Sequence, residues 1–230
     1  TPRSVIKGSA YLYPKSFVNN GPNGFNNTIR FTNNIISRKD LELLAPGLVR
    51  RYSKQLQGIT TLYVTAEADG NARKMVVHHL TAHSDRNDIS IDASGTVTDA
   101  LSTNSMRFDA RIYQLNLTRN VVEGFMDPKT RQQVQLPSSF QIKGAVRGGM
   151  TELDNDLSVN SGYGLAIIKG KLRNYMAQQK MGYNLRIMAK NLETGKWVKK
   201  GSLFGKANGK VNLKGSGMDY TTAAFQSGID

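Results

Sequence analysis

Alternation of apolar and polar residues in short segments is the feature that most restricts how this chain can fold. Between residues 183 and 191 every second residue is apolar: Tyr183, Leu185, Ile187 and Ala189. Successive side chains of a β-strand point to opposite faces, so this pattern predicts a strand with one apolar and one polar face. The same period recurs along most of the chain, which favours a β protein.

Turn-forming residues separate a series of such segments. Asp69-Gly70-Asn71 lies between the alternating runs 59–67 and 74–82, and this arrangement predicts a β-hairpin. Further strands are predicted at residues 88–92, 95–99, 106–116, 120–126, 132–136, 139–146, 163–172, 183–191, 196–200 and 206–214. Short strands at regular spacing indicate a mainly β protein, with an antiparallel β-sandwich or barrel-like domain.

One segment near the N-terminus has the period of a helix instead. Between residues 38 and 57, large apolar side chains recur at spacings of three and four: Leu41, Leu44, Leu48, Tyr52 and Leu56. Ser37 can cap this helix and Gly58 can end it. Because Pro46-Gly47 interrupts the pattern, a kinked helix or two short helices are expected as readily as one continuous helix.

The composition along the chain divides it into five parts. We expect an extended basic arm at residues 1–36 and a β-rich core domain at 37–147, with its helix at 38–57. A polar linker is expected at 148–162, a smaller basic C-terminal β unit at 163–215, and a flexible tail at 216–230. The 230-residue chain has no cysteine, so its core must be stable without disulfides.

Positive charge is concentrated at two places in the sequence. The net charge is +14 at pH 7. Six Lys or Arg residues precede the first acidic residue, Asp40, and residues 163–215 hold twelve against a single acid, Glu193. A field of one sign raises the association rate and the affinity for polyanions, so both regions are predicted to meet an anionic partner or a neighbouring subunit.

The candidate contact residues come from these two regions. In the C-terminal region the anionic partner is expected at Lys169, Lys171, Arg173, Lys196, Trp197, Lys199, Lys200, Lys206 and Lys210. In the arm, contacts are expected at Arg3, Lys7, Lys15 and Arg30. The aromatic residues among the lysines either stack on bases or sugars, or pack in the core while the lysines face solvent.

Residues that could carry out catalysis are few. The chain has no cysteine and no Gly-x-Ser-x-Gly sequence, and its histidines are His78, His79 and His83. His79 and His83 are four apart and, with Asp85, make a candidate metal site. Residues 74–82 alternate like a strand, however, and this does not suit ligands at helical spacing. We therefore expect a non-enzymatic protein without a cofactor or metal.

These features together predict a structural or assembly protein. It would self-associate as a subunit of a virion, an appendage or a cell-envelope complex, and contact its neighbours or an anionic polymer through the basic regions. Two alternatives use the same residues: a nucleic-acid-binding module, and a peripheral protein that binds anionic lipid or polysaccharide.

Two further features of the sequence bear on location. The longest uncharged stretch falls far short of the roughly 20 apolar residues that a transmembrane helix needs. The chain begins Thr1-Pro2-Arg3 without an initiator methionine, as in a shortened chain or a mature product that has lost a leader. Either origin permits export without showing it, and the sequence leaves the location unknown. Because we predict an assembly subunit, we favour a virion or an exported, cell-envelope location over the cytoplasm.

Overall fold

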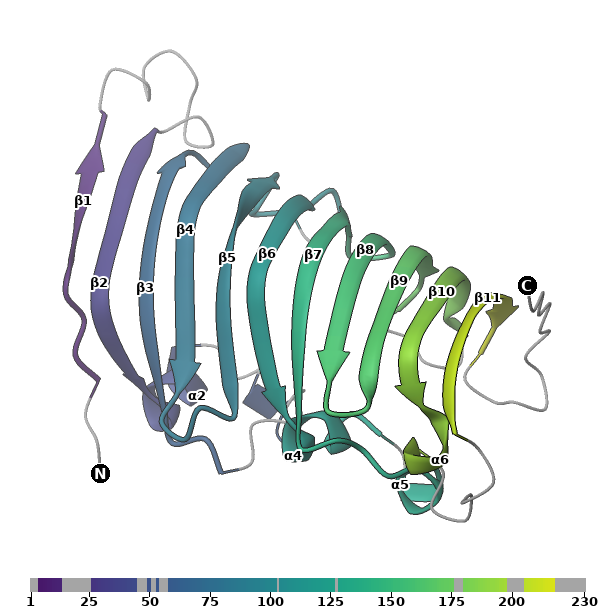
Figure 1. Cartoon of the computed structure of the whole chain (residues 1–230). Coiled ribbons are helices and arrows are strands. Elements are labelled where there is room, and N and C mark those ends of the chain that lie inside the picture. Colours follow the sequence, from purple (N-terminus) through teal and green to yellow (C-terminus); the bar gives the residue numbers. More distant parts are fainter. Residues whose placement is uncertain are drawn as a thin grey trace.

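The described strands form one antiparallel sheet in which each strand pairs with its neighbours in the chain. A computed structural model describes residues 4–13, 26–44, 49–50, 53, 58–102, 104–126, 128–175, 180–197 and 205–217. The sheet has 11 strands in the order β1 to β11, and they bend along their length (Figure 1). Sequence neighbours are therefore also spatial neighbours throughout.

The strands have similar lengths. From β2 onwards each has 10 to 12 residues. Their bounds are β1 (Gly8–Leu12), β2 (Asn27–Ser37), β3 (Thr61–Gly70), β4 (Lys74–Ser84), β5 (Ile89–Thr98), β6 (Arg107–Thr118), β7 (Ser139–Gly149), β8 (Glu152–Ser161), β9 (Gly164–Arg173), β10 (Gly182–Glu193) and β11 (Lys206–Ser216).

The mainly β, antiparallel class predicted from the sequence is confirmed, and so is the hairpin of β3 and β4. The predicted sandwich or barrel is not: the described strands make a single open sheet. The strands predicted at 88–92 and 95–99 are parts of one strand, β5, because Gly95 lies inside it rather than in a turn. Segments 120–126 and 132–136, predicted as strands, instead overlap helices α4 (Arg119–Glu123) and α5 (Pro128–Gln133).

The five predicted parts of the chain all contribute to this sheet where they are described. The segment 1–36 supplies β1 and most of β2, and the segment 148–162 contains β8. Strands β9 to β11, expected as a separate basic unit, continue the sheet directly from β8. Residues 218–230 of the predicted tail lie outside the described part of the chain.

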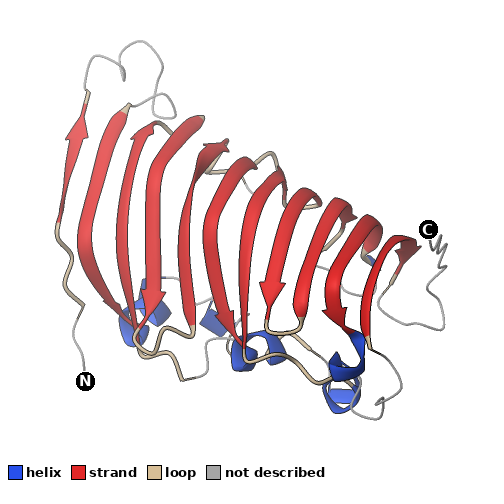
Figure 2. Cartoon of the chain, viewed as in Figure 1, coloured by secondary structure: helices blue, strands red, loops and turns tan. Residues whose placement is uncertain are grey.

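The helices lie at one end of the sheet (Figure 2). Helix α2 (Arg38–Leu44) follows β2, α4 and α5 join β6 to β7, and α6 (Thr194–Trp197) follows β10. Since β2, β6 and β10 run in the same direction, the helices that follow them lie at the same end of the strands. Helix α2 confirms the start of the predicted helical segment, while most of residues 45–57 lie outside the described residues.

The first turn of α2 holds the N-terminal segment against the sheet. Ser37 precedes the helix, and its Oγ accepts a hydrogen bond from the Asp40 backbone N–H at 3.3 Å and donates one to Asp40 Oδ2 at 2.7 Å. The Ser4 hydroxyl also donates to Asp40 Oδ2, and its Oγ accepts from the Ser37 N–H at 2.8 Å. This capping arrangement ties residue 4 to residue 40.

The pKa of Asp40 lies below its ordinary value, first because Ser4 and then because Ser37 donate to its carboxylate. A lowered pKa in the folded state stabilises the fold above the ordinary Asp pKa, and this is lost as pH falls through the folded-state pKa. Urea unfolding from pH 7 to 3 should therefore show wild type losing its advantage over Asp40→Asn. Ser4→Ala should raise the pKa of Asp40 in an NMR titration; superimposable acid profiles would contradict the assignment.

Bulges and glycines bend the strands. Register shifts occur in the pairs β2–β3, β3–β4, β4–β5, β5–β6, β6–β7 and β10–β11. Gly144 and Gly170 have φ values of 140° and 141°, which only glycine adopts easily. A Cβ at Gly144 would lie 2.0 Å from the Asp156 carbonyl oxygen on β8. Gly144 therefore allows a close approach of two backbones at a bend.

Candidate functional site

The register of the strands gives the sheet one apolar and one polar face. Residues that pair across neighbouring strands point to the same face. One such row, on the apolar face, crosses β8 to β11 as Leu157, Ile168, Ile187 and Val211. The next row, on the polar face, is Asp156, Lys169, Arg186 and Asn212.

The apolar face lacks a covering layer in the part of the chain that the structure describes. Leu157, Ile168, Ile187 and Val211 are all only half-buried. Among the described residues, the buried hydrophobic side chains are few and lie mostly near the helices: Val49, Ile59, Ala93, Val121, Leu136 and Phe140.

Helix α2 covers only a corner of this face. A small cavity is lined by Ile36 and Leu62, which pair across β2 and β3, and by Leu41 of the helix. Val49 and Ile59 also line it, together with Arg38, Thr60 and Thr61. Away from this end the apolar rows continue across the sheet, with no described element over them.

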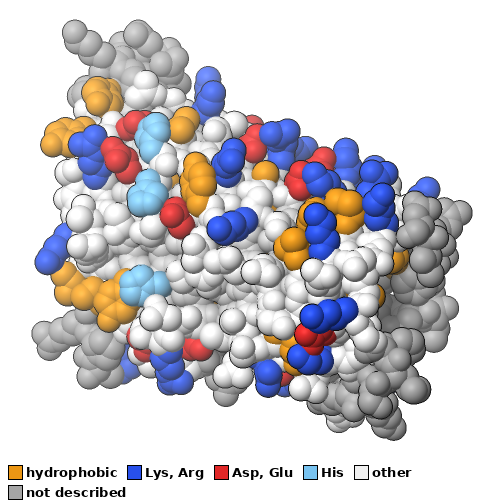
Figure 3. Space-filling model, viewed as in Figure 1, with side chains coloured by type: hydrophobic (Ala, Val, Ile, Leu, Met, Phe, Trp, Pro, Cys, Tyr) orange, Lys and Arg blue, Asp and Glu red, His pale blue; other side chains and the backbone are white. Residues whose placement is uncertain are grey.

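The polar face carries charged pairs between β8 and β9 (Figure 3). Lys169 Nζ lies 2.7 Å from Asp156 Oδ2, and Lys171 Nζ lies 3.9 Å from Asp154 Oδ2. In addition, Arg173 lies 3.7 Å from Glu152. All six side chains are at least half exposed, so each pair contributes about 1 kcal/mol or less. Their main effect is to neutralise three of the predicted contact residues.

The next two strands carry positive charge without such neutralisation. Arg186 and Lys190 of β10, and Lys210 and Lys214 of β11, are exposed on this face. Among the described residues none of these four has an acidic oxygen within ion-pair distance. Lys210, predicted as a contact residue, belongs to this group, whereas Arg186, Lys190 and Lys214 were not selected from the sequence.

The predicted contact residues around α6 contact other side chains of the same chain. Trp197 meets Tyr163 edge-on with ring centroids 5.8 Å apart, and Phe140 at 6.5 Å. Lys196 forms an ion pair with Glu193, which raises the pKa of Lys196 and lowers that of Glu193. The charge of Lys206 also lowers the pKa of Glu193. The predicted residues Lys199 and Lys200 lie outside the described residues.

Trp197→Ala should lower the free energy of unfolding by about 2 kcal/mol, because a half-buried ring would leave the cluster with Tyr163 and Phe140. Trp197→Phe should cost less than half as much, since Nε1 makes no hydrogen bond to any described residue. Chemical denaturation measures both. Equal losses in the two variants would show that the indole nitrogen, rather than packing, stabilises this corner.

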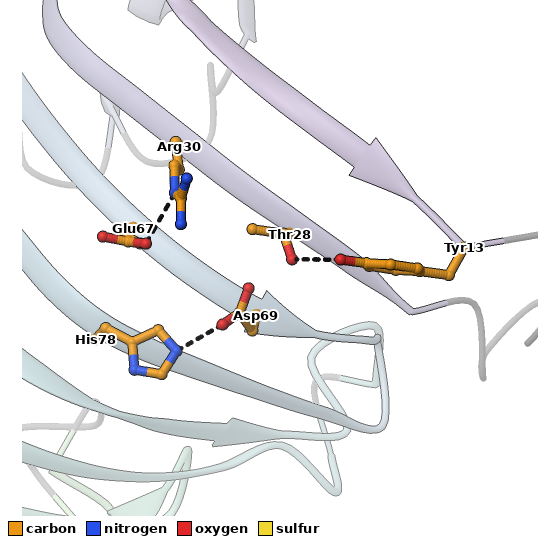
Figure 4. A network of polar contacts seen from close by, with 6 residues as sticks. All are labelled: Tyr13, Thr28, Arg30, Glu67, Asp69 and His78. Carbon is orange, nitrogen blue, oxygen red and sulfur yellow. Dashed lines mark hydrogen bonds and ion pairs between the residues drawn. The ribbon is translucent and has the colours of Figure 1, made fainter.

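The N-terminal strands carry a polar network of their own (Figure 4). Arg30 on β2 pairs with Glu67 on β3 at 2.8 Å, and His78 Nε2 lies 2.8 Å from Asp69 Oδ2. Hydrogen bonds from Thr28 and then His78 lower the pKa of Asp69. Arg30, predicted as an arm contact, is thus paired within the sheet.

The other predicted arm contacts differ in what the structure shows of them. Lys7 is exposed, and its backbone N–H donates to Asn34 Oδ1 at 2.6 Å. Its side chain is therefore available to a partner while its backbone is fixed to β2. Arg3 and Lys15 lie outside the described part of the chain.

The candidate metal ligands have separate contacts. His79 lies 3.6 Å from Asp92, while His83 stacks on Tyr63 with ring centroids 4.8 Å apart. Asp85 accepts a hydrogen bond from Thr60 at 2.6 Å. Within the described residues, no group of three or more His, Asp or Glu side chains is placed to hold a metal.

Comparisons with protein-family models, curated proteins and solved structures find no match to this chain. Among the described residues, no helix has the length and apolar character needed to span a bilayer. Function is therefore inferred from the two faces of the sheet.

Proposed function

We propose that the protein is a structural subunit whose apolar sheet face is covered by a second copy of the chain. The observation that supports this is the extended apolar face, formed by half-buried residues such as Leu157, Ile168 and Ile187, over which no described element lies. Burial of apolar surface drives most protein association. An uncovered face of this size in a monomer is typical of an interaction surface.

The size of the face suits a stable dimer. Ten strands about 4.8 Å apart and about 35 Å long present roughly 1,700 Å². A standard interface buries roughly 800 Å² on each partner, so contact over half of the face is sufficient. Two sheets packed face to face, about 10 Å apart, would complete the sandwich that the strand pattern suggests.

The lysines of the edge strand β11 favour contact between two copies through their sheet faces rather than through pairing of their β11 strands. Lys206, Lys210 and Lys214 occur at every fourth position of this edge strand. Lysines on an edge strand oppose pairing with another strand, because they bring like charges together and must lose hydration. The apolar face has no comparable barrier.

Such a subunit fits a larger assembly, for which a virion, an appendage or a cell-envelope complex remains our proposal. The test is the mass of the purified protein in solution by light scattering and sedimentation. We expect twice the mass of one chain at micromolar concentration. A monomer up to millimolar concentration, or a monomer that carries bound lipid or detergent on this face, would overturn the proposal.

A further inference from the structure

The polar face of β10 and β11 has a regular arrangement of cations and amides. Along β11 the exposed residues on this face alternate between lysine and asparagine: Lys206, Asn208, Lys210, Asn212 and Lys214. On β10, Asn184 is paired with Lys214, and Arg186 with Asn212. On β10 and β11, every charged side chain other than Glu193 is therefore positive.

The neighbouring strands β8 and β9 limit the extent of this positively charged surface. Lys169, Lys171 and Arg173 of β9 are partly neutralised by the acids of β8. Arg186, Lys190, Lys210 and Lys214 lie farther from those acids and form no ion pair with a described residue. We call these four residues the basic strip. Their charge is held by two strands whose backbones are paired along most of their length.

Two hollows lie along this part of the sheet. The first has a volume of about 470 Å³ and is lined by Lys169, Arg186, Met188, Lys210 and Asn212. The second has a volume of about 720 Å³ and is lined by Lys171, Arg173, Asn184 and Lys214 together with Gly182, Tyr183, Gly215 and Ser216. Each hollow thus combines cationic groups with amide N–H donors.

These features fit anionic oxygens more than any other ligand class. Ammonium and guanidinium groups bind phosphates by charge, and asparagine amides donate hydrogen bonds to phosphate oxygens. Successive lysines of β11 are about 14 Å apart along the strand, which requires a ligand with repeated charges rather than one small anion.

Nucleic acid fits this surface better than a membrane does. None of the large apolar side chains that are prominently exposed lies on β8 to β11, although stable attachment to a bilayer usually needs apolar insertion as well as charge. The one aromatic residue of β10 and β11, Tyr183, lies on the apolar face by its register, although it borders the second hollow. The basic strip itself therefore has no aromatic ring on which a base could stack.

We propose that the basic strip binds the phosphates of nucleic acid without reading its bases. Because the strip lies on the face opposite the proposed dimer contact, binding and dimerisation can fail independently. About four ion contacts predict a slope of log affinity against log salt of about −3.6, so affinity should fall roughly 150-fold between 50 and 200 mM salt.

The test is fluorescence anisotropy of a labelled mixed-sequence DNA duplex with the full chain. Lys210→Gln/Lys214→Gln should weaken binding at low salt and reduce the slope by about two. The matched control is Lys39→Gln/Lys74→Gln, which removes the same charge from α2 and β4 and should leave the slope unchanged. Light scattering on each variant checks the dimer separately.

Two results of the DNA experiments would overturn the proposal. One is an equal loss of slope in both double variants, because net charge rather than the basic strip would then determine binding. The other is the absence of a DNA complex at low salt. If the protein instead floats with vesicles that contain phosphatidylserine, the strip is a lipid-binding surface and the assignment to nucleic acid is wrong.

Discussion

Ile187→Lys should convert the proposed dimer into a folded monomer. Ile187 lies between Ile168 and Val211 in an apolar row, so packing of a second copy over this part of the face would bury it in the contact. An ammonium group there must lose hydration without gaining a partner. We expect the dimer dissociation constant to rise about 100-fold or more, which corresponds to roughly 3 kcal/mol.

The matched control is Met188→Lys, at the next position of β10. Its side chain is also apolar and half-buried, but it lies on the polar face between Ile167 and Lys210. Sedimentation should therefore show a dimer for Met188→Lys and a monomer for Ile187→Lys, with similar far-UV circular dichroism. Unchanged mass in Ile187→Lys, despite a folded spectrum, would mean that another surface joins the subunits.

Gly144→Ala should be among the most destabilising single-methyl additions in the sheet. With a φ of 140°, Gly144 has a backbone conformation that strains any other residue. The added Cβ would also meet the Asp156 carbonyl oxygen, which belongs to the backbone of β8 and cannot move alone. Together these effects should lower the free energy of unfolding by about 3 kcal/mol or more.

Gly209→Ala provides the comparison for this prediction. Gly209 also lies in a strand, β11, but a Cβ there has no neighbouring atom within 4 Å, and its φ is not in the left-handed region. Replacement by alanine should therefore be neutral or slightly stabilising. Urea denaturation of both variants measures the difference. Similar stabilities would show that β7 can straighten without loss of its pairing with β8.

The sequence predicted much of the local structure because local structure depends on near neighbours. Alternation located most of the strands, and the Asp69-Gly70-Asn71 turn located the hairpin of β3 and β4. The errors occurred where local patterns are ambiguous. The segment 120–126 contains β-branched residues, yet its first four residues belong to α4, where Val121 is buried.

The candidate site could be predicted only in part. The excess of lysines after residue 163 was visible, and Lys210 does lie on the exposed basic strip. The sequence could not show that Lys169 and Lys171 face Asp156 and Asp154, because this depends on the register of β8 against β9. With that register known, the four unneutralised positions can be separated from the neutralised ones.

By itself, the sequence determined that this chain forms strands with one apolar and one polar face, and that positive charge is in excess near its C-terminus. Only the tertiary structure decided that the strands join in chain order into one open sheet, and which lysines lack an acidic neighbour. The physical reason is that successive side chains of a strand point to opposite faces of the sheet, so the sequence alone shows which residues share a face. The closure of a sheet and the pairing of charges depend on curvature and on register between strands, to which bulges and glycines such as Gly144 contribute.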